Sequence, residues 1–155
     1  MLRNRVKSAG NGNGMNQVHR KRILHLMTAA SESVYHKSFM DLIYSSPELH
    51  EEFENVFFFL DSKKSRFLTW IQFVNEARKA SLIVSHGLFG LACEFLYLCP
   101  GAVSKTRWVI WGGDLYFDLN TDPDDSNKAY KKLYDGVRKH IKRSVVRNVN
   151  GFITV

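Results

Sequence analysis

Apolar runs of strand length alternate with helix-like segments along most of the chain. The runs typical of buried strands are 22–27, 55–60, 81–86, 107–111 and 151–155. Helical patterns lie between them, around 36–44, from Thr69, over 87–98 and from about Asn127. Strands that alternate with helices across short connections favour a parallel sheet covered by helices. The sequence therefore predicts an α/β fold, and its 155 residues suit a single domain.

The composition is that of a globular protein, with 45% hydrophobic and 13% aromatic residues. No uninterrupted apolar run approaches the ~18 residues of a membrane-spanning helix, so we expect a protein that is soluble or bound to a membrane surface. Cys93 and Cys99 stand six positions apart in an apolar segment without a CxxC pattern. They are expected to be reduced core thiols of a cytoplasmic protein, and no metal site is predicted.

Part of the net charge of +7 lies at the amino terminus. Residues 1–21 contain several arginines and lysines, no acidic residue and the run SAGNGNG. This composition is too polar and too rich in glycine to pack, so we expect a flexible basic leader, for which Met15 offers an alternative start. Residues 22–155 are expected to form the domain.

The helix predicted from about Asn127 is also basic. Its apolar positions, which are expected to form one stripe packed on the sheet, are Tyr130, Leu133, Tyr134, Val137, Ile141 and Val145. Around the stripe stand many cations, with Asp135 as the only acid. Those proposed to meet a membrane surface are Lys131, Lys132, Lys139, Lys142 and Arg143. The alternative is a solvated helix face.

In a parallel sheet, ligands bind at the carboxyl ends of the strands. Three segments are expected there: 28–36 (TAASESVYH), 86–90 (HGLFG) and 112–116 (GGDLY). Gly112 and Gly113 permit positive φ and close approach of a ligand, and Asp114 offers a carboxylate to a hydroxyl or a moving proton. A tight turn capped by Asp114 fits the same residues, and their spacing leaves both interpretations open.

The segment WVIWGGDLY, residues 108–116, resembles the W-x-I-W-G-x-D-L-Y signature of the 4-α-L-fucosyltransferase family, glycosyltransferase family 56. HGLF, residues 86–89, is similar to the H-G-x-F of that family at the same distance before the tryptophan motif. ILHLM followed by YHKSFMDLI is similar to its opening strand and histidine-containing helix. The chain departs from the family at Tyr35 and Lys37, which flank His36 where the family has His-His-Asn.

The resemblance implies a GT-B glycosyltransferase, in which two Rossmann-like domains with helices on both sheet faces meet across a cleft. Residues 22–155 are similar to the amino-terminal, acceptor-side domain, so the carboxy-terminal donor domain is expected to be absent from the chain and the chain alone inactive. The implied reaction transfers an amino-deoxysugar, such as N-acetylfucosamine, from a dTDP-sugar to a saccharide on undecaprenyl pyrophosphate. The expected pathway is synthesis of a surface polysaccharide like enterobacterial common antigen, without a metal or other cofactor.

On this reading Asp114 and His86 are the candidate catalytic residues. Asp114 is expected to be the base if the configuration at the transferred sugar is inverted, and to hold a hydroxyl if that configuration is retained. His86 either shares one of these roles or is a structural residue. The candidate substrate contacts are Gly112, Gly113, Tyr116, Gly87 and His36. His25, Trp108 and Trp111 are expected to be core residues.

The implied acceptor stays in the bilayer, so the protein is expected to be cytoplasmic and peripheral on the inner membrane, held to anionic lipid by its basic helix. The alternative function is that of a non-catalytic basic α/β module that binds nucleic acid or anionic membrane. Nucleic acid is disfavoured, because the aromatic residues lie mainly in apolar runs rather than beside a basic surface. No GxGxxG or Walker loop follows any predicted strand, which disfavours the common nucleotide-binding modules.

Overall fold

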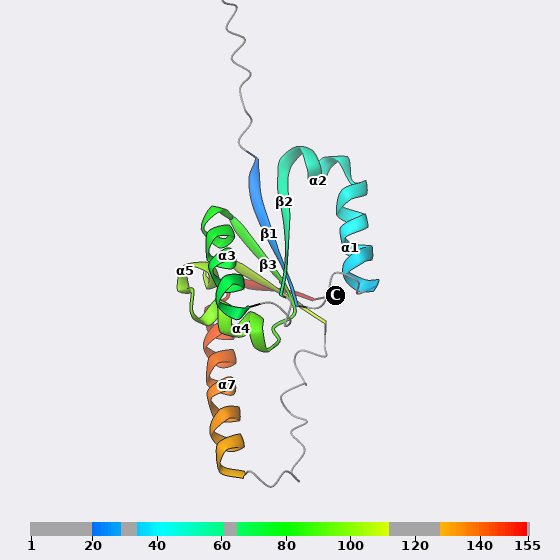
Figure 1. Cartoon of the computed structure of the whole chain (residues 1–155). Coiled ribbons are helices and arrows are strands. Elements are labelled where there is room, and N and C mark those ends of the chain that lie inside the picture. The colour runs from blue at the N-terminus through cyan, green and yellow to red at the C-terminus, as the bar shows by residue number, and fades with distance from the viewer. Residues whose placement is uncertain (1–19, 29–33, 61–64, 112–127, 155) are drawn as a thin grey trace, which may run out of the picture.

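The computed structural model describes residues 20–28, 34–60, 65–111 and 128–154, apart from the side chains of 35, 50 and 128–132 (Figure 1). Its strands are β1 (Lys21–Met27), β2 (Phe53–Phe59), β3 (Leu82–His86), β4 (Thr106–Ile110) and β5 (Gly151–Thr154). Its helices are α1 (Val34–Ser45), α2 (Pro47–Glu52), α3 (Arg66–Lys79), α4 (Gly90–Tyr97), α5 (Pro100–Val103) and α7 (Lys128–Asn148).

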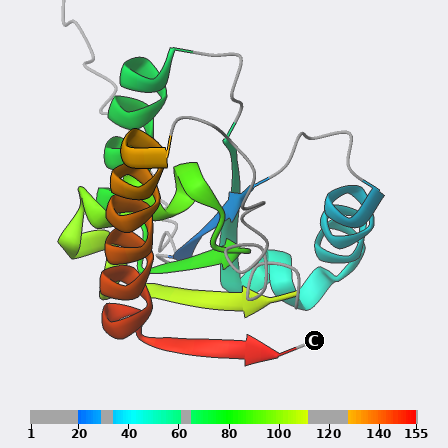
Figure 2. The same cartoon turned by 90° about the horizontal axis from the view of Figure 1, so that it is seen from below.

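The five strands form one all-parallel sheet in the order β2-β1-β3-β4-β5. From β1 the chain crosses to β2 on one side and then returns past β1 to β3. Right-handed crossovers in opposite directions place their helices on opposite faces of the sheet. Accordingly α1 and α2 lie on one face, and α3, α4, α5 and α7 lie on the other (Figures 1 and 2). The predicted α/β fold, Rossmann-like with helices on both faces, is confirmed.

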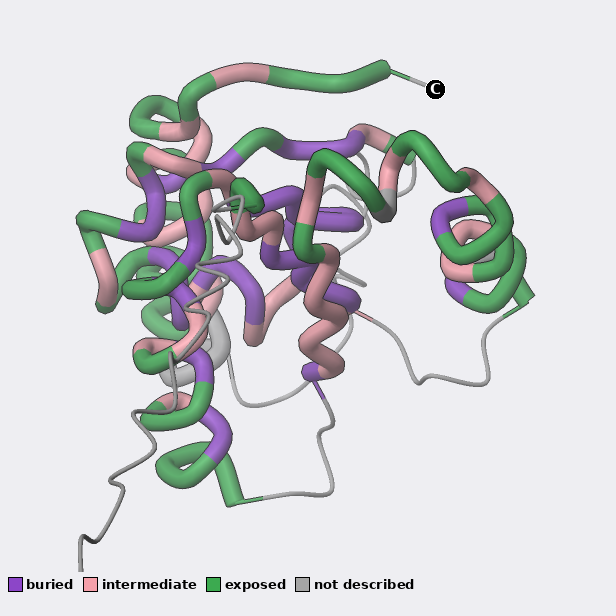
Figure 3. Tube along the Cα trace, turned by 90° about the horizontal axis from the view of Figure 1, so that it is seen from above, coloured by how far each residue is buried: buried purple, intermediate pink, exposed green. Residues whose placement is uncertain are grey.

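The main core lies between the sheet and the face that carries α3, α4, α5 and α7. Side chains of a strand alternate between faces, so Leu24 and Leu26 of β1 enter this core whereas His25 and Met27 face α1. Phe73 of α3 is fully buried, and its ring lies against Phe58 of β2 and Phe95 of α4. Figure 3 shows the buried residues gathered in the central strands, with the edge strand β5 largely exposed.

Local geometry moves two predicted helix boundaries. The helix expected from residue 87 begins only at Gly90, because Gly87 has φ +98° and Phe89 is extended. The helix expected from Thr69 begins earlier, at Arg66, and Thr69 lies inside α3 with its hydroxyl donating to the Ser65 carbonyl at 2.9 Å.

The packing expected along α7 is correct only for its second half. Val145 is buried and Ile141 packs against the core, but Leu133, Tyr134 and Val137 are 69%, 44% and 50% exposed. A helix of 21 residues is about 31 Å long, roughly twice the length of its neighbour β4, so the first half of α7 extends past the sheet (Figure 1). Periodicity identifies the stripe but not how far its neighbours reach.

Candidate functional site at the carboxyl ends of β1 and β3

The carboxyl ends of β1 and β3 form the topological switch point of the sheet. The chain leaves β1 for α1 on one face and leaves β3 for α4 on the other, so the two connections diverge, as at the ligand sites of open α/β sheets. Thr28 follows β1 and His86 ends β3. The Thr28 hydroxyl donates to the His86 carbonyl oxygen at 2.6 Å and so joins the two strand ends.

Gly87 turns the chain away from β3. A Cβ at this position would lie 2.7 Å from the ring of Phe89 and 3.2 Å from the Thr28 hydroxyl, and φ is +98°. Only glycine adopts this conformation without strain. The turn is closed by the Ser85 hydroxyl, which donates to the Gly87 carbonyl at 2.8 Å.

Three buried histidines gather on the face of the sheet that α1 covers. His25 comes from β1, His86 from β3 and His36 from α1, and none is more than 7% exposed. Phe39 of α1 lies with its ring centroid 4.4 Å from that of His86, and Phe57 of β2 stacks on His25 at 4.9 Å. The histidine rings therefore occupy an aromatic layer between α1 and the sheet.

Hydrogen bonds connect two of these histidines to β2. Nδ1 of His25 lies 3.2 Å from Nε2 of His86, and Nε2 of His25 lies 3.0 Å from the side-chain oxygen of Asn55. The Asn55 amide donates in turn to the Leu49 carbonyl at 3.1 Å. Nδ1 of His86 is buried and has no hydrogen-bond partner in the part of the chain that the structure describes.

The cluster favours neutral imidazoles. Burial lowers the pKa of His25, with partial opposition from its bond to Asn55. Burial, followed by the nearby His25 and His36, lowers the pKa of His86 to about 3. At neutral pH His86 is therefore uncharged, so it offers a hydrogen-bond acceptor rather than a counter-charge for an anion.

The structure brings together three of the residues singled out from the sequence: His86, Gly87 and His36. Gly112, Gly113, Asp114 and Tyr116 lie outside the described residues. They follow β4, which adjoins β3 and ends at the same edge of the sheet.

The core prediction holds for Trp108, which is 2% exposed, but is wrong for Trp111, which is 42% exposed. Trp108 points into the core beside α7, whereas Trp111 follows the last residue of β4 and lies beyond the paired part of the sheet.

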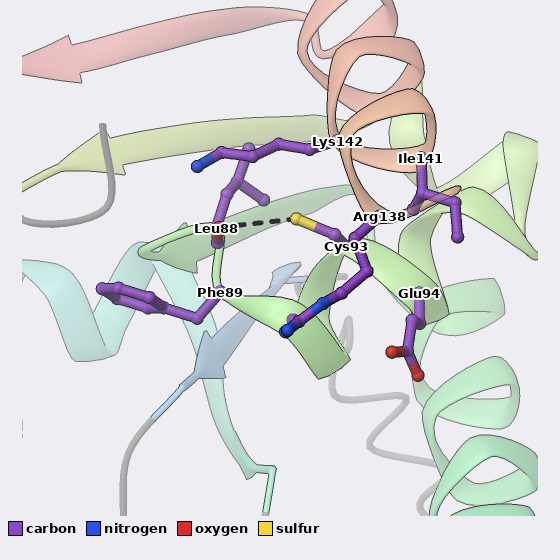
Figure 4. Close-up of a pocket in the computed structure, with 8 residues that line it drawn as sticks. Leu88, Phe89, Cys93, Glu94, Arg138, Ile141 and Lys142 are labelled. Carbon is purple, nitrogen blue, oxygen red and sulfur yellow. Dashed lines mark hydrogen bonds between the residues drawn. The ribbon is translucent and has the colours of Figure 1, made fainter. Parts of the chain in front are cut away.

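A pocket of about 220 Å³ opens beside this edge, between the start of α4 and α7 (Figure 4). It is lined by Leu88, Phe89, Gly90, Cys93, Glu94, Arg138, Ile141 and Lys142. The Arg138 guanidinium lies so close to Gly90 that a Cβ there would be 2.5 Å from Nη2. The pocket joins segments about 50 positions apart, and the sequence carried no signal for this pairing.

His25 is buried, as its place inside an apolar run predicts, but its partner Asn55 was not predicted. An asparagine at the start of an otherwise apolar strand was the available signal, because a polar side chain in such a run needs a buried partner. Within the described ranges, no group of three histidine, cysteine or acidic residues is arranged to hold a metal ion. None of the helices in those ranges combines the length and apolarity needed to cross a bilayer.

Comparison with known proteins found no family model, no curated protein and no solved structure that matches the chain.

Proposed function

We propose that residues 22–155 are the acceptor-side domain of a GT-B glycosyltransferase similar to glycosyltransferase family 56. The observation that carries the proposal is the arrangement at the switch point, where HGLF turns from β3 at Gly87 and leaves a neutral, buried His86 at the strand end. A neutral imidazole that can accept a hydrogen bond suits a substrate with hydroxyl groups, such as a sugar. The segment that resembles the family signature continues from β4 at the same edge.

The proposed reaction transfers an amino-deoxysugar such as N-acetylfucosamine to a saccharide carried on undecaprenyl pyrophosphate. The acceptor hydroxyl oxygen forms the new glycosidic bond as the bond from the sugar to dTDP breaks, and dTDP leaves with the bonding electron pair. The hydroxyl proton passes to a base, for which Asp114 is the candidate. Gly112, Gly113, Tyr116, Gly87 and His36 are the proposed acceptor contacts, and a second domain supplies the dTDP-sugar site.

Attachment to the cytoplasmic face of the inner membrane is part of the proposal. The first half of α7 leaves Leu133, Tyr134 and Val137 exposed beside Arg138 and Lys139. Exposed apolar side chains flanked by cations are typical of helices that lie in the headgroup region of anionic bilayers. Lys142 and Arg143 continue the basic surface, and Lys131 and Lys132 belong to the same helix although their side chains lie outside the described set.

The direct test is binding of the acceptor by the chain as it stands. A short-chain polyprenyl pyrophosphate saccharide is titrated into the 155-residue protein and followed by calorimetry. We expect binding that Asp114→Asn weakens at least tenfold and that Asp41→Asn, an exposed carboxylate on α1, leaves unchanged. The titration is then repeated with dTDP alone, which should bind weakly or not at all. Absence of acceptor binding, or equal effects of the two variants, would contradict the proposal.

The exposed half of α7 also favours a second candidate, a non-catalytic module that binds anionic membrane. This candidate predicts binding to anionic vesicles with no affinity for the saccharide. Salt-sensitive binding to oligonucleotides without binding to vesicles would indicate the nucleic-acid version instead.

A further inference from the structure

Leu49, Asn55, His25 and His86 are connected by three hydrogen bonds, and the donor of each bond can be assigned. Their starting point is the Leu49 carbonyl, which can only accept, so the Asn55 side chain must present its amide group to Leu49 and its oxygen to His25. The Asn55 oxygen can only accept in turn. Nε2 of His25 therefore carries the proton of the bond to Asn55.

The proton on Nε2 of His25 also determines the tautomer of His86. A neutral His25 that is protonated at Nε2 has a bare Nδ1, and that nitrogen lies 3.2 Å from Nε2 of His86. Nε2 of His86 must then donate, which leaves Nδ1 of His86 as a bare acceptor. Asn55, on a different strand, thus determines which nitrogen of His86 is free.

The surroundings keep the two rings in place. Phe57 stacks on His25, and Phe39 lies against both His25 and His86 with centroids 5.3 Å and 4.4 Å away. The other titratable group that faces this pair from a described element is His36 of α1, whose ring centroid is 6.4 Å from that of His86. Among the described residues, no carboxylate forms an ion pair or hydrogen bond with His25 or His86. The pair is therefore held as two neutral imidazoles of fixed tautomer.

We propose that His25 and Asn55 are positioning residues that keep Nδ1 of His86 unprotonated, and that this nitrogen accepts a hydrogen bond from a hydroxyl of a ligand bound at the switch point. The bare Nδ1 is buried, and a buried acceptor without a partner calls for a donor from a bound molecule or water. The identification of that hydroxyl as one of a saccharide rests on the proposed function.

The lowered pKa of His86 limits what this side chain can do to the hydroxyl. The pKa of His86, lowered to about 3 by burial, makes Nδ1 a weak base at neutral pH. Such a nitrogen can align a hydroxyl but is poorly suited to remove its proton. In this proposal His86 therefore aligns the hydroxyl and does not remove its proton.

Nitrogen-15 NMR of the histidine rings in the intact chain tests the positioning role, because protonated and bare ring nitrogens have well separated shifts. We expect His25 and His86 to be protonated at Nε2 and bare at Nδ1. Asn55→Leu removes the acceptor of His25, so His25 should take its proton on Nδ1 and donate to His86, which reverses the tautomer of His86. Asn75→Leu, at an exposed position on α3, is the matched control.

A second variant keeps the inference testable if Asn55→Leu does not fold. His25→Phe keeps an aromatic ring between Phe39 and Phe57 but removes the acceptor for His86, so the two tautomers of His86 should become mixed. The inference is overturned if His86 carries its proton on Nδ1 in the unaltered chain, or if folded Asn55→Leu and His25→Phe proteins both retain the original tautomer.

The ligand is tested with methyl N-acetyl-β-glucosaminide as the probe. We expect saturation to shift the Nδ1 resonance of His86, and His25→Phe to weaken binding about tenfold. Binding of the glycoside without a response at Nδ1 would overturn the inference and leave the proposed function standing. Conversely, a response at Nδ1 combined with failure to bind the polyprenyl pyrophosphate saccharide would overturn the proposed function alone.

Discussion

Thr28 and His86 join the two strands at the centre of the sheet, because the Thr28 hydroxyl donates to the His86 carbonyl oxygen at 2.6 Å. Thr28→Val keeps the shape of the side chain and removes this donor. We expect the free energy of unfolding to decrease by about 1 kcal/mol, the net value of one intramolecular hydrogen bond. Urea denaturation measures the change. Thr28→Ser restores the hydroxyl and should recover most of the loss; equal losses in both variants would mean that packing, not the bond, matters.

Gly87 and Gly136 give a matched pair of glycine-to-alanine substitutions with opposite expected signs. At Gly87 a Cβ would meet the Phe89 ring at 2.7 Å with φ at +98°, so alanine should destabilise by about 2 kcal/mol. At Gly136, inside α7, a Cβ meets nothing within 4 Å, and alanine should stabilise by roughly 0.5–1 kcal/mol. Thermal unfolding reports both changes. The same sign at the two sites would contradict the described turn.

The buried histidines predict loss of stability in mild acid. The pKa of His86 is about 3 in the folded protein and ordinarily 6.5, so between these values the unfolded chain binds more protons. Between pH 6.5 and about 3, the free energy of unfolding should therefore fall by up to about 1.4 kcal/mol per pH unit because of His86, and the lowered pKa of His25 acts in the same direction. Above pH 6.5 this contribution is complete.

Urea midpoints measured from pH 7.5 to pH 4.5 test this dependence. His86→Leu should make the pH profile shallower, whereas His140→Leu, at an exposed position on α7, serves as the control. An unchanged profile in His86→Leu would show that other groups cause the acid sensitivity.

Phe73 should be the most costly of the α3 side chains to truncate. It is fully buried between the rings of Phe58 and Phe95, so Phe73→Ala should destabilise by about 3–5 kcal/mol. Phe67 lies on the same helix but is 66% exposed, and Phe67→Ala should change stability by no more than about 0.5 kcal/mol. Chemical denaturation of the pair tests which face of α3 meets the core.

The proposed attachment to a membrane through α7 predicts that vesicle binding depends on the exposed apolar residues of this helix. Replacement of Leu133 and Val137 by serine should weaken binding to phosphatidylglycerol-containing vesicles at least tenfold, measured by co-sedimentation. The matched control replaces Val34 and Leu42, which are equally exposed on α1 across the sheet. Similar losses in both double variants would argue against α7 as the contact.

The strands were predictable because each is a short apolar run, and the position of His86 at a strand end followed from that pattern. The hydrogen bonds that connect His86 to His25 and His25 to Asn55 were not predictable, because His25 and Asn55 meet only through the lateral register of β1 with β2. Periodicity likewise identified the apolar stripe of α7, but the length of the sheet determined that Leu133 stays exposed. Short helices such as α2 have too few residues to show a period at all.

The central place of β1 has a consequence for synthesis on the ribosome. Its register with β3 pairs Met27 with His86, so one edge of the first strand stays open until 59 further residues have been added. At the usual rate of translation this takes about 3–12 s. During that interval β1 can pair only with β2, and the nascent β-α-β unit of β1, α1, α2 and β2 exposes the apolar side chains that later form the core. The first strand to be made is therefore enclosed only after β2, α3 and β3 have been synthesised.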